Sequence, residues 1–199
     1  DSRFGERKGL LDLTSIEREL GLYPVPIEGS LKAHGWHGNV ILFREGSVRD
    51  VHPVNLPGLE PRGALVSELE LKNGGIIRVV AAHFGLLRHS RAQQARRLVE
   101  LLSERDEVPS VVMGDLNEWR IGRGSSLETF RKAFGVLPDP VASFPSNLPV
   151  FPLDRIIASY DGLIGKVEAH NSALARVASD HLPIKAEIDH QTLLAATAA

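Results

Sequence analysis

Apolar and polar positions along the chain follow two periods, and both periods recur from one end to the other. Apolar residues at helical spacing predict a short helix over 11–20, a long helix over 88–107 and a third helix over 126–135. The buried stripe of the long helix would be formed by Ala95, Leu98, Leu101 and Leu102. The helices therefore alternate with strands instead of forming a separate block.

Short runs of apolar and β-branched residues between turn formers predict the strands. These runs cover residues 23–27, 39–44, 64–71, 75–83, 110–115, 153–159 and 181–188. Asn73, Gly74 and Gly75 separate two of the runs and predict a β-hairpin. Residues 190–199 are expected to be a frayed end. Because the chain shows no internal repeat, low-complexity segment or linker, we predict one mixed α/β domain over residues 1–199.

Polar side chains stand where four of the predicted strands begin or end. They are His83, Asp115 with Asn117, Asp154, and Asp180 with His181. Each taken singly has a simpler explanation, as a turn residue or as a hydrogen-bonded core histidine. Four strand ends together favour a site, because sites gather where strand ends and their loops converge. Three carboxylates, two imidazoles and one carboxamide are the groups that metal-assisted hydrolysis uses.

The segment 108–120, with sequence VPSVVMGDLNEWR, poses the question most sharply. A strongly apolar strand runs directly into Gly114, Asp115, Leu116 and Asn117. Gly, Asp and Asn are turn formers, so a turn is one interpretation. In the other interpretation, Asp115 and Asn117 contact one ligand together, because residues i and i+2 of an extended segment point to the same side.

The amino-acid composition narrows the possible functional classes of the protein only slightly. The hydrophobic fraction of 43% and the charged fraction of 24% are those of an ordinary globular protein. No apolar run approaches the length of a membrane span. The net charge of −2 gives no broad basic field of the kind that a nucleic-acid-binding protein presents. The absence of cysteine excludes disulfides, thiolate nucleophiles and cysteine-based zinc sites, and it leaves the cellular compartment open.

The motifs GDLN (114–117), LDRI (153–156) and SDHLP (179–183) follow GNVILFR (38–44) and a strand ending in His83. In this order they resemble the endonuclease/exonuclease/phosphatase superfamily, whose deoxyribonuclease I-like members are metal-dependent phosphohydrolases. The resemblance spans roughly residues 22–189. It implies a four-layer α/β sandwich of two packed, mostly antiparallel sheets with helices outside.

The resemblance also implies roles for the matched residues. Asp115 would orient or deprotonate the attacking water, and Asn117 would hold the phosphate or that water. Asp180 would be a metal ligand together with Asp115 and Asn117, or would orient His83. Hard oxygen ligands without a thiolate favour Mg²⁺ or Mn²⁺ over zinc.

The two histidines would act on the phosphate group. His181 would contact the scissile phosphate or act as a base, with Asp154 fixing its tautomer and raising its basicity. His83 would donate to a phosphate oxygen or to the leaving group. A phosphodiester gains charge in its transition state, so these donors and the metal, and not a covalent nucleophile, should dominate catalysis.

Residues outside the motifs carry weaker expectations. Asn39 would shape the floor of the site or cap a turn, Arg62 would reach a phosphate or form a surface salt bridge, and Trp119 would touch a leaving group or belong to the core. Four arginines of the long helix are interpreted as a solvated face: Arg88, Arg91, Arg96 and Arg97.

One departure from the family pattern concerns the start of the chain. Family members begin with two strands, the second of which ends in the Glu that is the principal metal ligand. This sequence opens with DSRFGER, which resembles the segment just after that Glu, and Glu6 has no apolar strand before it. We therefore expect an N-terminally truncated domain that lacks this carboxylate.

Two functions are consistent with the sequence. The first is a metal-dependent hydrolase of phosphodiester or phosphomonoester bonds, whose substrate would be nucleic acid, a phospholipid headgroup or a small phosphodiester. The second is a catalytically impaired or inactive module of the same fold, because the strand with the metal-binding Glu is absent. No obligate protein partner is evident.

Overall fold

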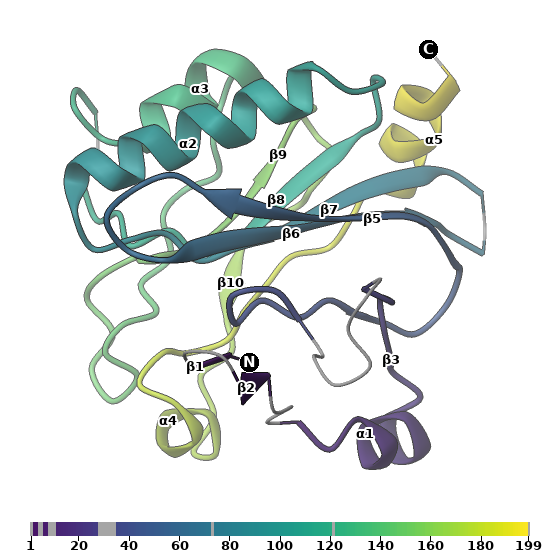
Figure 1. Ribbon diagram of the computed structural model, residues 1–199, viewed down its shortest axis with the longest axis horizontal. Coiled ribbons are helices and arrows are strands. Elements are labelled where there is room, and N and C mark those ends of the chain that lie inside the picture. The colour runs from purple at the N-terminus through teal and green to yellow at the C-terminus, as the bar shows by residue number, and fades with distance from the viewer. Residues whose placement is uncertain are drawn as a thin grey trace.

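The central feature of the computed structural model is a five-stranded sheet with the strand order β5-β6-β7-β8-β9 (Figure 1). Its strands are β5 (Ser47–Leu56), β6 (Arg62–Glu70), β7 (Ile76–Ala82), β8 (Ser110–Asp115) and β9 (Asp154–Ala158). Strands β7 and β8 run parallel, and the other neighbouring pairs are antiparallel. The structure describes residues 2–3, 6–7, 11–27, 35–72, 74–120 and 122–198. Asn73 of the predicted hairpin lies outside them, although β6 and β7 do form an antiparallel pair.

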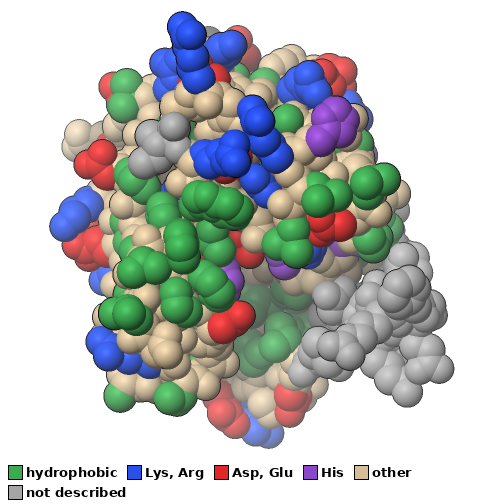
Figure 2. Space-filling view, turned by 90° about the vertical axis from the view of Figure 1, so that its left-hand side faces the viewer, with side chains coloured by type: hydrophobic (Ala, Val, Ile, Leu, Met, Phe, Trp, Pro, Cys, Tyr) green, Lys and Arg blue, Asp and Glu red, His purple; other side chains and the backbone are tan. Residues whose placement is uncertain are grey.

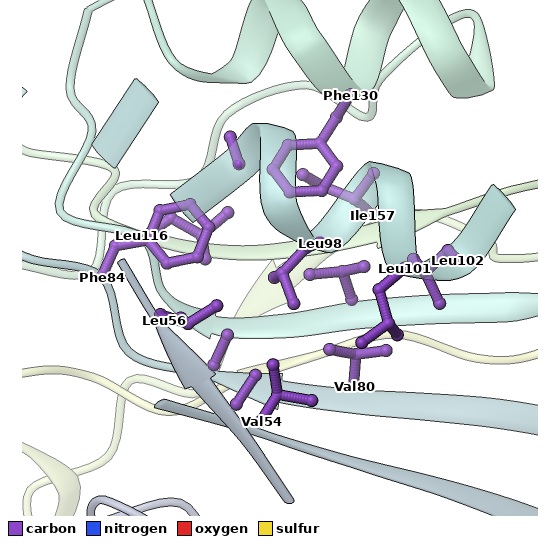
Figure 3. Close-up of a cluster of buried hydrophobic side chains, with 14 of the residues drawn as sticks. Val54, Leu56, Val80, Phe84, Leu98, Leu101, Leu102, Leu116, Phe130 and Ile157 are labelled. Carbon is purple, nitrogen blue, oxygen red and sulfur yellow. The ribbon is translucent and has the colours of Figure 1, made fainter. Parts of the chain in front are cut away.

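Helices α2 (Arg88–Ser103) and α3 (Leu127–Phe134) cover one face of this sheet (Figure 1). The apolar stripe predicted for the long helix is buried, and Ala95 and Leu98 have no exposed surface. Figure 3 shows these side chains packed against the strands below, and the labelled members are Val54, Leu56, Val80, Phe84, Leu98, Leu101, Leu102, Leu116, Phe130 and Ile157. Full burial of each large apolar side chain contributes about 1.5–3 kcal/mol, so this layer fixes the helices on the sheet.

The opposite face of the sheet carries a second core and two short antiparallel ladders. One ladder joins β3 (Tyr23–Pro24) to β4 (Leu42–Phe43), and the other joins β10 (Glu168–Ala169) to β11 (Ile184–Lys185). Helices α1 (Leu13–Leu20) and α4 (Ala175–Ala178) lie beyond these ladders in Figure 1. The order is thus helices, large sheet, short ladders and helices. A further pair, β1 (Ser2–Arg3) and β2 (Glu6–Arg7), lies near the N-terminus.

The structure differs from the sequence prediction in several elements. Residues 190–199 were expected to be frayed, yet His190–Ala198 form helix α5, and the side chain of Leu193 is fully buried in the second core. The ten-residue strand β5 was not predicted. The runs 39–44 and 181–188 contribute only two residues each to a ladder. Among the described residues, no helix is long and apolar enough to cross a membrane.

The register of the three strands β7, β8 and β9 brings their polar ends to one level. Ala81 lies opposite Met113, and Asp115 lies opposite Asp154. Just beyond β7, the backbone N–H of Phe84 donates to the carbonyl of Asp115 at 2.9 Å. His83, Asp115 and Asp154 therefore stand side by side at one edge of the sheet.

Candidate active site

Asp115 occupies the centre of the candidate active site. Its Oδ2 atom lies 3.5 Å from Nε2 of His83 and 4.0 Å from Nε2 of His181. Burial raises the pKa of the Asp115 carboxyl, and the backbone N–H of Asn117 opposes that rise while the nearby Asp154 carboxylate adds to it. One carboxylate oxygen thus faces two imidazoles in a partly desolvated place, where a proton is taken up more readily than by an exposed aspartate.

His181 is hydrogen-bonded to Asp154, as the family resemblance implied. Its Nδ1 lies 2.7 Å from Oδ2 of Asp154, and the same oxygen accepts a hydrogen bond from the Ser143 hydroxyl at 2.5 Å. The ring also contacts Phe144, with 4.9 Å between the ring centroids. Burial lowers the pKa of His181, but the hydrogen bond and charge of Asp154 outweigh it, and the net pKa is raised. Nε2 is left facing Asp115.

The surroundings of His83 shift its pKa in the direction opposite to that of His181. The Nη1 atom of Arg62 lies 3.2 Å from its Nδ1 and 3.1 Å from its Nε2, so the guanidinium sits over the ring. Arg62 is itself fixed by Glu60, whose Oε2 accepts from Nε at 3.3 Å and from Nη2 at 3.1 Å. Burial and then the Arg62 charge lower the pKa of His83, against the opposing pull of Asp115. His83 is therefore neutral at a pH where His181 is still protonated.

Asn117 adopts the turn that the sequence left open. Its φ of 51° is left-handed, a conformation that Asn tolerates better than most residues. Its backbone N–H donates to Oδ1 of Asp115 at 2.8 Å, and its side-chain Nδ2 donates to the carbonyl of Phe84 at 2.9 Å. The amide nitrogen is thus used to join the ends of β7 and β8, and the same turn fixes the Asp115 carboxylate.

The remaining residues that the sequence predicted for the site have other hydrogen-bond partners or are exposed. Asn39 caps its own turn, because its Nδ2 donates to the carbonyls of Trp36 at 2.9 Å and Gly63 at 3.0 Å. Trp119 is half exposed and does not belong to the core. The exposed carboxylate of Asp180 accepts a hydrogen bond from the Ser179 hydroxyl at 3.4 Å. His83 is approached by Asp115 and Arg62, and among the described residues no contact joins it to Asp180.

Comparison with known proteins gives a consistent picture of the fold. No family model matches the sequence. The chain is 32% identical over 164 residues to the uncharacterized protein YbhP of Escherichia coli K12, an alignment that covers 77% of this chain and 63% of YbhP. The chain therefore spans less than two thirds of the length of the curated relatives it matches.

Solved structures resemble it more completely. The mannosyl-6-phosphatase of Bacteroides thetaiotaomicron superposes with a TM-score of 0.70 at 16% identity, covering 89% of this chain and 80% of its own. An endonuclease/exonuclease/phosphatase family protein of the same organism gives 0.69 at 15% identity, with 87% and 77% covered. The chain has the endonuclease/exonuclease/phosphatase fold. The predicted sandwich is confirmed, with a five-stranded mixed sheet as its larger layer.

This fold holds magnesium in one of the similar structures. Beta toxin of Staphylococcus aureus, with bound magnesium ions, superposes with a TM-score of 0.63 at 17% identity and coverage of 89% and 81%. Within the described part of the present chain, no three His, Asp or Glu side chains are arranged to hold a metal ion. The Asp115 carboxylate is held by the backbone N–H of Asn117, while the buried carboxamide of Asn117 donates to the carbonyl of Phe84.

A buried charged cluster beneath the site was not anticipated from the sequence. Glu118 has no exposed surface, and it accepts hydrogen bonds from the backbone N–H of Arg120 at 3.1 Å and of Ser126 at 3.0 Å. Arg91 Nε lies 3.5 Å from the Glu118 carboxylate, and Arg155 donates to the Glu118 carbonyl at 3.1 Å. The interpretation of Arg91 as part of a solvated helix face is wrong, because only 2% of this residue is exposed.

The cluster joins the segments that carry the site. Arg91 also donates to the carbonyls of Gly85 and Leu86, just after His83. Arg155 directly follows Asp154 along β9, and Glu118 directly follows Asn117. The carboxylate of Glu118 thus faces the Arg91 guanidinium of α2, and its backbone carbonyl accepts from Arg155 of β9. These contacts link the segments that follow β7 and β8 to the start of β9. Sequence alone pairs none of these residues, because 27 and 37 positions separate Glu118 from Arg91 and Arg155.

Replacing Glu118 by Gln should destabilise the protein strongly. Removal of one partner from a buried ion pair leaves uncompensated buried charge and costs about 3–5 kcal/mol. Urea unfolding of Glu118→Gln measures this loss. The control is Glu128→Gln, which removes the half-buried partner of the exposed Arg131 and should change the unfolding midpoint far less. Equal midpoints for Glu118→Gln and wild type would show that the cluster does not stabilise the strand ends.

The pairing of His181 with Asp154 predicts a pH dependence. A raised pKa means that the folded protein binds the proton more tightly than the unfolded chain. The resulting stability is fully present below the ordinary pKa of imidazole, and it is lost as the pH rises through the raised pKa of folded His181. NMR titration of the His181 ring should show this raised pKa. In Asp154→Asn the pKa of His181 should fall below its wild-type value, because burial remains while the hydrogen bond to a carboxylate and its charge are lost. An unchanged titration would contradict the role of Asp154.

Proposed function

We propose that this chain is a hydrolase of phosphate esters in which Asp115 activates the attacking water. The observation that supports it is the position of one Asp115 oxygen, 3.5 Å and 4.0 Å from the Nε2 atoms of His83 and His181, in a fold shared with a phosphatase. A carboxylate whose pKa is raised by burial is a stronger base than a free one. Water bound between the imidazoles would have this base within reach.

His181 and His83 would have different roles, because their pKa values are shifted in opposite directions. Environments that push the pKa values of two like groups apart separate acid from base. His181, protonated through Asp154, would bind a phosphate oxygen through Nε2–H and offset the negative charge that develops there. His83, neutral beside Arg62, would donate a hydrogen bond to another phosphate oxygen or to the leaving group. Arg62 would add a fixed positive charge at the same position.

In the proposed reaction, one bond to phosphorus forms and one breaks, and the proton of the water has a stated acceptor. The water oxygen forms a bond to phosphorus and gives its proton to Asp115, the bond from phosphorus to the ester oxygen breaks, and that oxygen takes up a proton from the site or from solvent. Asn117 would hold the water or the phosphate with its carboxamide oxygen while its nitrogen stays bound to Phe84.

Mg²⁺ or Mn²⁺ is the cofactor we propose, with Asp115, Asn117 and Asp180 as its donors. All three offer oxygen, which these hard cations prefer. The magnesium bound by beta toxin in the same fold supports a divalent ion. The substrate would be a phosphodiester or phosphomonoester of nucleic acid, a phospholipid headgroup or a small molecule. The net charge of −2 gives little support to DNA, whose binding depends on phosphate contacts to a basic face.

Catalysis should depend on the central carboxylate and the paired histidine. Asp115→Asn and His181→Ala should each reduce hydrolysis of bis-p-nitrophenyl phosphate by at least ~10²-fold, the usual contribution of proton transfer or charge stabilisation. His52→Ala, at an exposed position of β5, is the matched control and should retain full activity. The rate is followed by release of p-nitrophenolate with magnesium or manganese present. Wild-type turnover in the Asp115 variant would refute the assignment.

The second candidate function, an inactive or impaired module, is favoured by the incomplete set of metal donors in the described chain. Mg²⁺ dehydrates reluctantly, so too few charged oxygens compete poorly with water. Calorimetric titration of the 199-residue chain should then show binding only at roughly millimolar Mg²⁺ or above, abolished in Asp115→Asn. Tight binding with full turnover would show that another residue completes the ligand set, and it would exclude the module.

A further inference from the structure

Each of the four segments that carries an active-site group also carries large apolar side chains that face solvent. Leu86 and Leu87 follow His83, Trp119 follows Asn117, a group of three precedes Asp154, and a pair on and beside α4 precedes His181. We call this set the apolar rim: Leu86, Leu87, Trp119, Leu148, Val150, Phe151, Leu174 and Val177. The most exposed members are Leu148 at 70%, Leu174 at 75% and Val177 at 81%.

Hydrogen bonds join the segments of the rim in two pairs. The Ser146 hydroxyl donates to the carbonyl of Arg176 at 3.1 Å, and this joins the segment 144–153 to α4. Arg88 donates to the carbonyl of Gly124 at 3.1 Å, and this joins the start of α2 to the segment after Trp119. Figure 2 shows hydrophobic side chains gathered on both sides of a recess in which histidine side chains are visible. The rim therefore borders the mouth of the site.

The charges on these segments have one sign. Residues 84–91, 119–124, 144–153 and 170–178 contain no Asp or Glu, although the whole chain has more acidic than basic residues. The exposed charged residues there are the cations Arg88, Arg120, Arg123 and Arg176. Figure 2 shows Lys and Arg side chains next to the apolar ones on this face, with Asp and Glu side chains closer to the recess. A surface that combines apolar side chains with cations complements an interface with apolar chains and anionic headgroups.

We propose that the apolar rim docks onto a lipid surface with anionic phosphate headgroups, and that the substrate is an amphiphilic phosphate ester presented by that surface. The proposal rests on the hydrolase function proposed above and names its substrate class. Exposed apolar groups that cluster mark an interaction site. A folded protein partner or a second copy seated on the rim would close the mouth that it borders. A lipid surface covers the same side chains and delivers a phosphate to the recess.

Vesicle flotation tests the proposal. The 199-residue chain is mixed with phosphatidylcholine vesicles that contain phosphatidylglycerol, and separately with vesicles of phosphatidylcholine alone. The wild-type chain should float with the anionic vesicles, less so at high salt because the arginine contribution is screened. The double variant Leu174→Ser/Val177→Ser and the single variant Leu148→Ser should each bind about tenfold more weakly, since each loses apolar area that the lipid would cover.

The control substitutes an apolar residue of similar exposure elsewhere. Leu20, the last residue of α1, is 54% exposed, and α1 lies apart from α2 and α4 in Figure 1, so Leu20→Ser should float like wild type. Hydrolysis of bis-p-nitrophenyl phosphate, which needs no lipid surface, should be equal in all these variants. This second assay separates failure of the docking surface from failure of the hydrolase function.

Three results would overturn the docking surface. They are a wild-type chain that stays in the aqueous fraction with both kinds of vesicle, rim variants that float as well as wild type, and a wild-type dimer in light scattering that Leu174→Ser/Val177→Ser converts to monomer. Flotation that depends on the rim, without hydrolysis of any phosphate ester, would support the surface and overturn the hydrolase function on which the substrate class rests.

Discussion

The register of β7, β8 and β9 is the constraint on which the rest of the site depends. Strands β7 and β8 lie parallel, so both deliver their carboxyl ends to one edge, and antiparallel β9 begins at the same edge with Asp154 opposite Asp115. A slip of one residue would turn every side chain of a strand to the other face. Gly114 fixes the last step, because it adopts a φ of +133° and an added Cβ would lie 2.1 Å from the carbonyl oxygen of Ala82. Only glycine permits this approach of β8 to β7, directly before the central carboxylate.

That register forces two carboxylates together, and the imidazoles make the arrangement tolerable. Asp154 raises the pKa of Asp115, as expected for like charges held close. His181 bridges them, with Nδ1 on Asp154 and Nε2 towards Asp115. On the other side, burial and the charge of Arg62 lower the pKa of His83. The pKa values of the two histidines are shifted in opposite directions because their neighbours differ, an aspartate for one and an arginine for the other, so chemically identical side chains can take different parts in one reaction.

The sequence predicted those features whose signal is local. Apolar runs ending in polar residues located β7, β8 and β9, and the motifs around Asp154 and His181 indicated their hydrogen bond. Strand β5 was not predicted because it lies at the sheet edge, is largely exposed and contains Pro53, which an edge strand tolerates. Helix α5 was not predicted because its stability comes from tertiary packing of Leu193 and not from its weak local pattern. Burial of Arg91 and its pairing with Glu118 depend on how α2 lies against the sheet, and no local pattern encodes that.

The segment after His83 is held by polar side chains that bond its backbone, so its apolar side chains are free to face outward. Gln94 of α2, fully buried, accepts from the N–H of Gly85 at 2.9 Å and donates to the carbonyl of Pro57 at 3.0 Å. Glu60 accepts from the N–H of Leu86 at 2.8 Å. Because the backbone is anchored in this way, Leu86 and Leu87 are not needed as core residues. Loops usually attach themselves by burying their largest apolar side chains, whereas here the anchor is polar and the apolar groups border the recess. A site fixed from below by hydrogen bonds can thus keep an apolar rim that faces solvent in the isolated chain.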